Sequence, residues 1–263
     1  MNSTVEMLNV SLDNLSTDEV LEKLKSGGMV VTPNIDHMIK LQKDREFYQI
    51  YQDADYRTCD SQIMVFLSRL TNRPIKERVS GSDLFPKFCD YYKNDEDMKI
   101  FLLGGRPGVP EAAQKNINHK VGRNMAIGAH SPSFGFEKNE DECQKIIQMI
   151  NDSGATVLGV GVGAPKQEKW IYKYKNKLKN IKIFFAIGAT IDFEAGYIHR
   201  SPAWMSDWGI EWIHRIASDP KRLWKRYLIE DMPFFWLMLK EQLGLYRNPF
   251  EPSQNLAERN VQI

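Results

Sequence analysis

The sequence predicts an α/β protein: a Rossmann-like, mainly parallel sheet with helices on both faces, followed by a helical C-terminal appendage. Short apolar runs alternate with segments of helical periodicity up to about residue 196. Strands that alternate with helices pair in parallel, and helices cover both faces of such a sheet. Several apolar runs end in glycine or small polar residues, as strands do at the ligand crevice of an open α/β sheet.

Apolar periodicity and capping residues predict the elements in order. Strands are expected at 5–10, 29–32, 56–60, 99–105, 124–130, 155–163 and 181–189. Helices are expected at 16–28, 44–54, 61–70, from 81, and from about Pro165. Ser16 or Thr17 is the expected N-cap of the first helix, which Gly27 and Gly28 end.

The chain divides into three parts by pattern. Residues 1–196 form the Rossmann-like domain, residues 197–250 form a helical appendage rich in Trp and Arg, and residues 251–263 form a flexible tail. Beyond Tyr197 the strand pattern stops, and five of the six tryptophans lie there.

Composition excludes several classes of protein. A net charge of +1 argues against a general nucleic-acid binder. The three cysteines contain no CxxC pair, which indicates reduced thiols and no zinc site. The N-terminus lacks a signal-peptide pattern. The apolar stretch at 232–239 is far shorter than the roughly 20 residues that span a bilayer. A soluble protein, or one that rests on a membrane surface, is expected.

Polar side chains follow two of the predicted strands. Thr32 and Asn34 follow one strand, and Asp60 ends the next strand along the chain. In isolation Asp60 could be a helix N-cap, but a carboxylate that faces hydroxyl and amide groups in a cleft suits a general base. His37 is an alternative base, although a single histidine at a helix start is more often structural.

Two glycine-rich strand ends could approach a phosphate. Gly161 lies in the segment 157–170 and Gly104 in the segment 102–108. Glycines allow a ligand to approach the backbone, and a following helix offers free N–H groups. Neither segment is GxGxxG or carries a Walker lysine, so a tight turn between strand and helix is the alternative.

Two further side chains have both a binding and a structural interpretation. Asp192 could bind ribose hydroxyls or cap the next helix. Arg78 precedes Gly81 and an expected N-cap at Ser82, where it could meet a diphosphate or be solvated. The acidic triplets 53–55 and 95–97 do not follow strands, so we predict no required metal.

The segment 212–240 interleaves aromatic residues with cations. Between Ile213 and Tyr227 there are five Lys or Arg and one Asp. This pattern suits an anionic bilayer surface. Helices packed on the main domain with a solvated basic face are the alternative, and single-stranded nucleic acid is disfavoured by the neutral net charge.

Eight segments together resemble the WecG/TagA/CpsF glycosyltransferases (glycosyltransferase family twenty-six). In order along the chain they are TPNIDH, ADYRTCDS, ERVSGSDL, LLGGRPG, VGVGAPKQEKW, AIGATIDFEAG, RSPAWMSDWGIEWIHRI and DPKRLWKRYL, and they cover about residues 5 to 230. Many members have Asp-Gly where this chain has Asp60-Ser61, but serine can still start a helix.

The resemblance implies an inverting, metal-independent enzyme that needs no cofactor. Such enzymes move a sugar, N-acetylmannosamine, its uronic acid or a related hexose, from a UDP-sugar to a polyprenyl-diphosphate-linked saccharide in cell-surface polysaccharide synthesis. It implies a peripheral location on the cytoplasmic face of a bacterial membrane. Rival interpretations are a nucleotide-binding membrane adaptor without catalysis and another nucleotide-cofactor Rossmann enzyme. Self-association into a homo-oligomer through the appendage is also open.

The resemblance also assigns roles to residues. Asp60 becomes the general base, with Thr32 and Asn34 as its partners, and Arg78 would meet the diphosphate. The glycines Gly104 and Gly161 fall in the nucleotide-side turns, where Gln167 and Asp192 would also lie. The appendage residues implied at the membrane or the acceptor diphosphate are Arg215, Arg222, Lys225 and Arg226.

Overall fold

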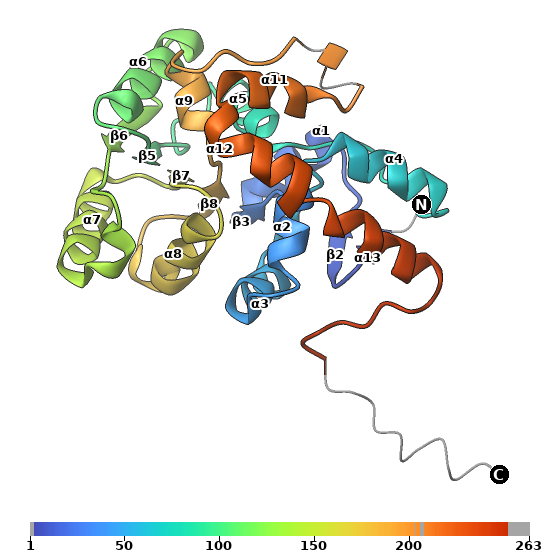
Figure 1. The fold of residues 1–263 in the computed structure, drawn as a ribbon. Helices are drawn as coiled ribbons and strands as arrows, with labels where there is room; N and C mark the ends of the chain where they lie inside the picture. Colours follow the sequence, from blue (N-terminus) through green and yellow to red (C-terminus); the bar gives the residue numbers. More distant parts are fainter. Residues whose placement is uncertain (1–2, 203, 206–207, 252–263) are drawn as a thin grey trace.

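A computed structural model describes residues 3–202, 204–205 and 208–251. Its centre is a six-stranded sheet in the order β4-β3-β8-β7-β5-β6, and every pair in it is parallel (Figure 1). The strands are β3 (Gly28–Val31), β4 (Tyr56–Arg57), β5 (Ile100–Gly104), β6 (Ala126–His130), β7 (Val157–Gly161) and β8 (Ile183–Ala186). The predicted parallel sheet is therefore confirmed.

Helices cover both faces of this sheet, as alternating strands and helices predict (Figure 1). One buried apolar cluster joins the sheet to α1 (Thr17–Lys23), α5 (Gly81–Tyr91), α6 (Val109–Val121) and α9 (Thr190–Glu194). The other cluster joins it to α2 (Ile35–Lys40), α3 (Arg45–Asp53), α4 (Gln62–Leu70), α7 (Glu140–Ser153) and α8 (Lys166–Tyr174). Val30 belongs to the first cluster and Val31 to the second, because successive side chains of a strand point to opposite faces.

The N-terminal segment differs from the prediction of one strand at 5–10. It forms an antiparallel hairpin, β1 (Thr4–Met7) with β2 (Val10–Asp13), outside the main sheet. Leu8 turns the chain with a φ of 54°. Leu8 and Asn9 are both buried at this turn, and Asn9 donates to the Leu41 carbonyl (2.8 Å). Asn9 is the only usual turn residue of this pair and lies inside an apolar run, so apolar periodicity alone misses the turn.

Capping residues set the helix starts. Ser16 forms a capping box with Glu19, as expected. Ser61 caps α4, so the Asp60-Ser61 pair does start a helix. The prediction of Ser82 as the cap of α5 is wrong: Ser80 is the N-cap, its Oγ accepting from Asp83 N–H (3.1 Å), because the helix already begins at Gly81.

The appendage folds back over the domain instead of extending from it. It contains α11 (Glu211–Ser218), α12 (Pro220–Lys225), the π-helix η4 (Arg226–Glu230) and α13 (Pro233–Gln242). Figure 1 shows α13 near α2 and β2, and both η4 and α13 contact α2. Phe234 and Met238 are buried in the same cluster as α2 and α3. Residues 252–263 of the predicted tail lie outside the described residues. Within the described part of the chain, no helix has the length and apolarity to cross a membrane.

Gly104 marks the closest approach of two strands. A Cβ at this position would lie 2.3 Å from the Gly161 carbonyl oxygen, and the φ of Gly104 is +135°.

We expect Gly104→Ala to lower the free energy of unfolding by about 3 kcal/mol or more, from backbone strain and the clash together. Gly122→Ala is the matched control, because Gly122 has a φ of +74° and no atom within 4 Å of the added Cβ. Its cost should be about 1–2 kcal/mol. Equal costs in urea unfolding would show that strand contact does not require Gly104.

Candidate active site

A cavity of about 480 Å³ lies where the carboxyl ends of β3 and β4 meet the appendage. Its wall is formed by three groups of residues: the loop after β3, the loop after β4 together with Arg78, and the appendage. They are Asn34, Ile35, Asp36, Asp60, Ser61, Gln62, Ile63, Arg78, Gly209, Glu211, Trp212, Arg215, Arg226, Tyr227, Leu228, Asp231, Met232 and Phe235. The appendage therefore forms one side of the cavity over the sheet edge.

Backbone hydrogen bonds bring the two polar strand ends together. The Asp60 N–H donates to the Pro33 carbonyl (3.0 Å), which continues the β3–β4 pairing beyond the strands. The Val79 N–H donates to the Cys59 carbonyl (2.8 Å), so Arg78 is held beside Asp60. The predicted common edge of the two strand ends is thus confirmed.

Asp60 is half-buried and has an unusual proton affinity. Burial raises its pKa from 3.8 to about 7, while Arg215 and Arg78 oppose this shift. Glu211 and Asp83 raise it further by like-charge repulsion. Arg78 Nη1 lies 4.0 Å from Asp60 Oδ1. A carboxylate with a pKa near neutrality in a cavity suits a general base.

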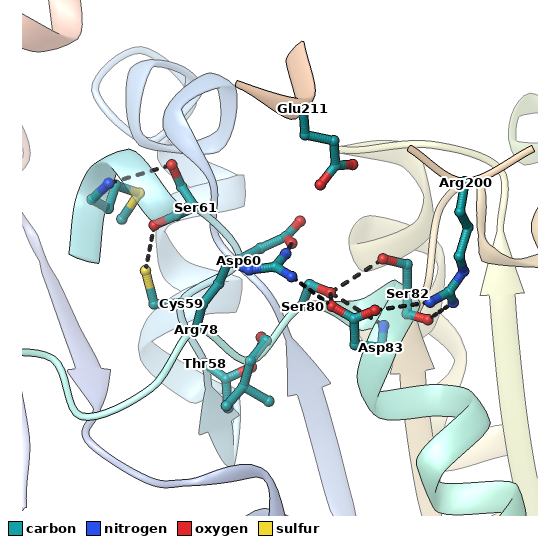
Figure 2. Close-up of polar contacts among 12 residues, drawn as sticks. Thr58, Cys59, Asp60, Ser61, Arg78, Ser80, Ser82, Asp83, Arg200 and Glu211 are labelled. Atoms are coloured by element: carbon teal, nitrogen blue, oxygen red, sulfur yellow. Dashed lines mark hydrogen bonds and ion pairs between the residues drawn. The ribbon is translucent and has the colours of Figure 1, made fainter. Parts of the chain in front are cut away.

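A network of hydrogen bonds and ion pairs fixes Arg78 (Figure 2). Arg78 Nη2 donates to Asp83 Oδ2 (2.8 Å), which also accepts from Ser80 Oγ (2.7 Å). The other oxygen of Asp83 pairs with Arg200 Nη1 (2.8 Å), and Arg200 also donates to the Ser82 carbonyl. One side of the Arg78 guanidinium therefore lies toward Asp60, and the other is held by Asp83 in the first turn of α5.

The predicted partners of Asp60 have different surroundings. Asn34 lines the cavity and caps α2, its Oδ1 accepting from the His37 N–H (3.1 Å). Thr32 is buried and is not part of the cavity wall, and its side chain packs against Gly81. His37 is buried against the Tyr51 hydroxyl (2.8 Å), and burial lowers its pKa to about 3. Its structural interpretation is confirmed, because a neutral buried imidazole bonded to Tyr51 does not face the cavity.

The glycine turns lie farther along the same sheet edge, after β5, β7 and β8. Gln167 holds two of them together: its Oε1 accepts from the N–H groups of Gly163 (3.2 Å) and Gly188 (3.1 Å). Its Nε2 donates to the buried Glu168 (3.0 Å), whose pKa burial raises to about 7. Both the carbonyl and the NH2 group of Gln167 are thus hydrogen-bonded within the protein, and the carbonyl links the two turns.

The other predicted nucleotide residues occupy the same region. Gly104 and Gly161 face each other in the β5–β7 pair, where a Cβ on either would clash with backbone. Asp192 lies in the first turn of α9. It does not cap this helix, because Ala189 is the N-cap and provides no side-chain cap bond. None of these three lines the cavity at Asp60.

Two of the four predicted appendage cations line the cavity. Arg215 pairs with Glu211 (2.6 Å) and lies close enough to Asp60 to lower its pKa. Arg226 pairs with Asp36 (3.4 Å) and lies over the Tyr227 ring. Lys225 is exposed, pairs with Glu230 (3.6 Å) and is not part of the wall. The side chain of Arg222 lies outside the described part of the chain.

Several cavity residues were not singled out from sequence. Asp36, Glu211 and Asp231 contribute carboxylates, and Trp212 and Tyr227 contribute rings. Asp36 follows a polar strand end, a signal that could have identified it. The others follow no strand, and helical periodicity does not reveal which helix covers the sheet edge.

Residues of the two acidic triplets accept hydrogen bonds within the fold. Asp53 accepts from the Tyr172 hydroxyl (2.6 Å), and Asp55 accepts from the Met29 N–H (2.8 Å). Asp95 accepts from the Asp97 N–H (3.0 Å) in a turn. Over residues 3–202, 204–205 and 208–251, no three His, Cys, Asp or Glu side chains gather as a metal-ion site would need.

The fold and the cavity together define a class of protein. A carboxylate with a raised pKa, beside two arginines at the carboxyl edge of a parallel sheet, suits a transferase that deprotonates a hydroxyl next to an anionic leaving group. The model of the glycosyl transferase WecG/TagA/CpsF family matches residues 5–248. The chain therefore belongs to this family and is a glycosyltransferase.

Curated relatives from two bacteria are similar to the chain. One is the N-acetylglucosaminyldiphosphoundecaprenol N-acetyl-beta-D-mannosaminyltransferase of Bacillus subtilis (strain 168), 26% identical over 219 residues, which cover 83% of this chain and 81% of the relative. The protein of the same name from Staphylococcus aureus (strain MRSA252) is 26% identical over 239 residues, covering 88% and 90%.

Proposed function

We propose that the protein transfers N-acetylmannosamine, or a closely related sugar, from a UDP-sugar to a polyprenyl-diphosphate-linked N-acetylglucosamine. The single observation that carries this proposal is Asp60 beside Arg78 and Arg215 in a cavity that the appendage partly covers. The relatives named above support the choice of sugars.

The reaction is an in-line displacement. The acceptor hydroxyl oxygen attacks the anomeric carbon, the bond from that carbon to the diphosphate oxygen breaks, and its electron pair leaves with UDP. Asp60 takes the proton of the hydroxyl, and the configuration at the anomeric carbon inverts. Asp60 is suited to this step because its pKa of about 7 leaves much of it ionised at neutral pH while keeping it basic.

Arginine side chains supply the charge that the leaving group needs. Arg78 and Arg215 both lie at Asp60, and Arg226 lines the same wall. Guanidinium groups bind phosphate oxygens with two parallel hydrogen bonds. These cations support a mechanism that requires no metal. The nucleotide itself belongs over the glycine turns of β5, β7 and β8, where backbone approach is possible.

Calorimetry separates this proposal from its rivals. With EDTA present, UDP should bind, whereas NAD and S-adenosylmethionine should not. Binding of NAD or S-adenosylmethionine in place of UDP would favour another Rossmann enzyme. UDP binding without any transfer to an acceptor would favour an adaptor. NMR of the transfer product should then show inverted anomeric configuration, and retention would exclude a single displacement.

The appendage offers a surface for a membrane. Large apolar side chains stand exposed on it: Trp208, Trp224, Leu228, Ile229, Met232, Phe235, Trp236, Leu239 and Leu243. Lys221 and Lys225 are exposed on α12 among them. An apolar surface interleaved with cations suits the headgroup region of an anionic bilayer, where a polyprenyl-linked acceptor resides.

We expect the double variant Trp224→Ser/Trp236→Ser to bind anionic vesicles at least about tenfold more weakly than the wild type, because the exposed apolar area that enters the interface is lost. The Tm should not change, since both side chains are exposed. Tyr91→Ser is the matched control, because Tyr91 is exposed on α5. Unchanged sedimentation of the double variant with vesicles would contradict membrane contact through α12 and α13.

A further inference from the structure

Asp231 is a buried carboxylate on the cavity wall with an oxygen that nothing in the described chain satisfies. It follows η4 and is 5% exposed, and its backbone N–H donates to the Arg226 carbonyl (2.9 Å). Its Oδ1 is buried without a hydrogen-bond partner among the described residues. A buried oxygen of a charged group without a donor is costly to the fold, so such an atom needs an explanation.

Arg226 presents the complementary atom on the same wall. Its Nη2 reaches Asp36 Oδ2 (3.4 Å), which already accepts from Lys40 Nζ (2.6 Å). Its Nε is buried and has no acceptor among the described residues. Two residues of the wall, Asp231 and Arg226, therefore each carry a buried polar atom without a partner among the described residues, one an acceptor and the other a donor.

We infer that Asp231, together with Arg226, binds a hydroxyl or acetamido group of the acceptor sugar. This inference rests on the proposed function. A sugar hydroxyl donates one hydrogen bond and accepts others, and an acetamido group has one N–H and one carbonyl. Either group has both the donor that Asp231 Oδ1 lacks and the acceptor that Arg226 Nε lacks, whereas a phosphate would be repelled by the carboxylate.

The apolar neighbours of Asp231 in the cavity wall favour the acceptor over the donor. In the order β4-β3-β8-β7-β5-β6, the glycine turns lie after β8, β7 and β5, and Asp60 follows β4. Asp231 instead comes from the appendage and lies near Asp36 and Lys40 of α2, which follows β3. Its neighbours in the wall, Met232 and Phe235, are 53% and 41% exposed, which leaves an apolar opening for a lipid chain. Asp231 therefore shares a wall with Asp60 and lies beside exposed apolar side chains, which suits an acceptor sugar that carries a lipid chain.

Steady-state kinetics of Asp231→Ala and Asp231→Asn test this role, with a soluble polyprenyl-diphosphate N-acetylglucosamine analogue as acceptor. We expect Asp231→Ala to raise the KM for the acceptor at least about tenfold, since a hydrogen bond to a charged group is lost. The Asn variant should lie between it and the wild type. The KM for the UDP-sugar and kcat should change less than about threefold. Glu230→Gln is the control, because it removes a charge from an exposed neighbouring side chain outside this cavity.

Thermal unfolding of the same variants separates ligand binding from a structural role. A buried carboxylate oxygen without a hydrogen-bond partner lowers the stability of the folded protein. Both variants should therefore have a Tm equal to or above that of the wild type. A Tm lowered in both would show that the protein itself satisfies Asp231, and would overturn the inference. So would an unchanged acceptor KM, or a rise in the donor KM alone. Transfer by the wild-type enzyme tests the proposed function separately, because the variants are compared only through their ratios to it.

Discussion

Asp60→Asn is expected to lower turnover about 10²–10⁴-fold with the fold intact, because that is the usual contribution of a general base. The amide has the same shape and cannot take the proton of the acceptor hydroxyl. The initial rate of UDP release gives the turnover, and circular dichroism checks that the fold is intact. Asp90→Asn is the control for a lost carboxylate, since Asp90 is 77% exposed on α5. Turnover near that of the wild type would remove Asp60 from this role.

The pH dependence of Asp60 follows from the direction of its pKa shift. The base must be ionised, so kcat/KM should rise with pH and level off above about pH 7. For stability the sign is opposite. The folded-state pKa lies above the ordinary aspartate value of 3.8, so the cost of the buried charge is absent below pH 3.8 and complete above about pH 7. At pH 8, Asp60→Asn should therefore unfold at the same Tm as the wild type or a higher one.

Arg215→Gln is expected to lower turnover about 10²–10³-fold, as loss of one electrostatic contact to a developing charge does. Arg215 is also the cation that most lowers the pKa of Asp60. Its removal should therefore move the rise in kcat/KM to higher pH, a shift that a residue engaged only with membrane would not cause. Lys115→Gln on α6 is the control, because Lys115 is an exposed cation on a helix outside the cavity wall.

Two results would contradict this account of Arg215. Turnover within about threefold of the wild type would show that Arg215 does not act on the leaving group. A lower turnover with an unchanged pH profile would show that it acts without contact to Asp60. Vesicle sedimentation of the same variant separates membrane contact from catalysis, because Arg215 lines the cavity and should leave vesicle binding nearly unchanged.

Strand ends were predictable from sequence, and helix packing was not. The apolar runs that became β5, β7 and β8 are continuous, because strands buried on both faces lack polar alternation. The meeting of the Thr32–Asn34 and Asp60 loops followed from parallel pairing alone, since carboxyl ends share one edge. Within that edge, Thr32 lies beside Gly81 and outside the cavity wall, a tertiary placement that no local pattern encodes.

The appendage is the part of the fold whose packing the sequence predicted least. An amphipathic pattern indicates that a helix has an apolar face, but it does not indicate which surface covers that face. The segment 212–240 was therefore open between a membrane and the main domain. Phe234 packs in the core, Trp236 is exposed two residues later, and Arg215 and Arg226 line the cavity. One segment thus contributes to the core, the cavity wall and an exposed apolar surface.

Acceptor-dependent release of UDP is the measurement that tests the central claim most directly. A panel of UDP-sugars would be supplied with EDTA and a polyprenyl-diphosphate N-acetylglucosamine analogue. We predict rapid release with UDP-N-acetylmannosamine or one close relative, only when the acceptor is present, and its loss in Asp60→Asn. Release that is independent of the acceptor, or that survives in Asp60→Asn at the wild-type rate, would contradict a transferase built around Asp60.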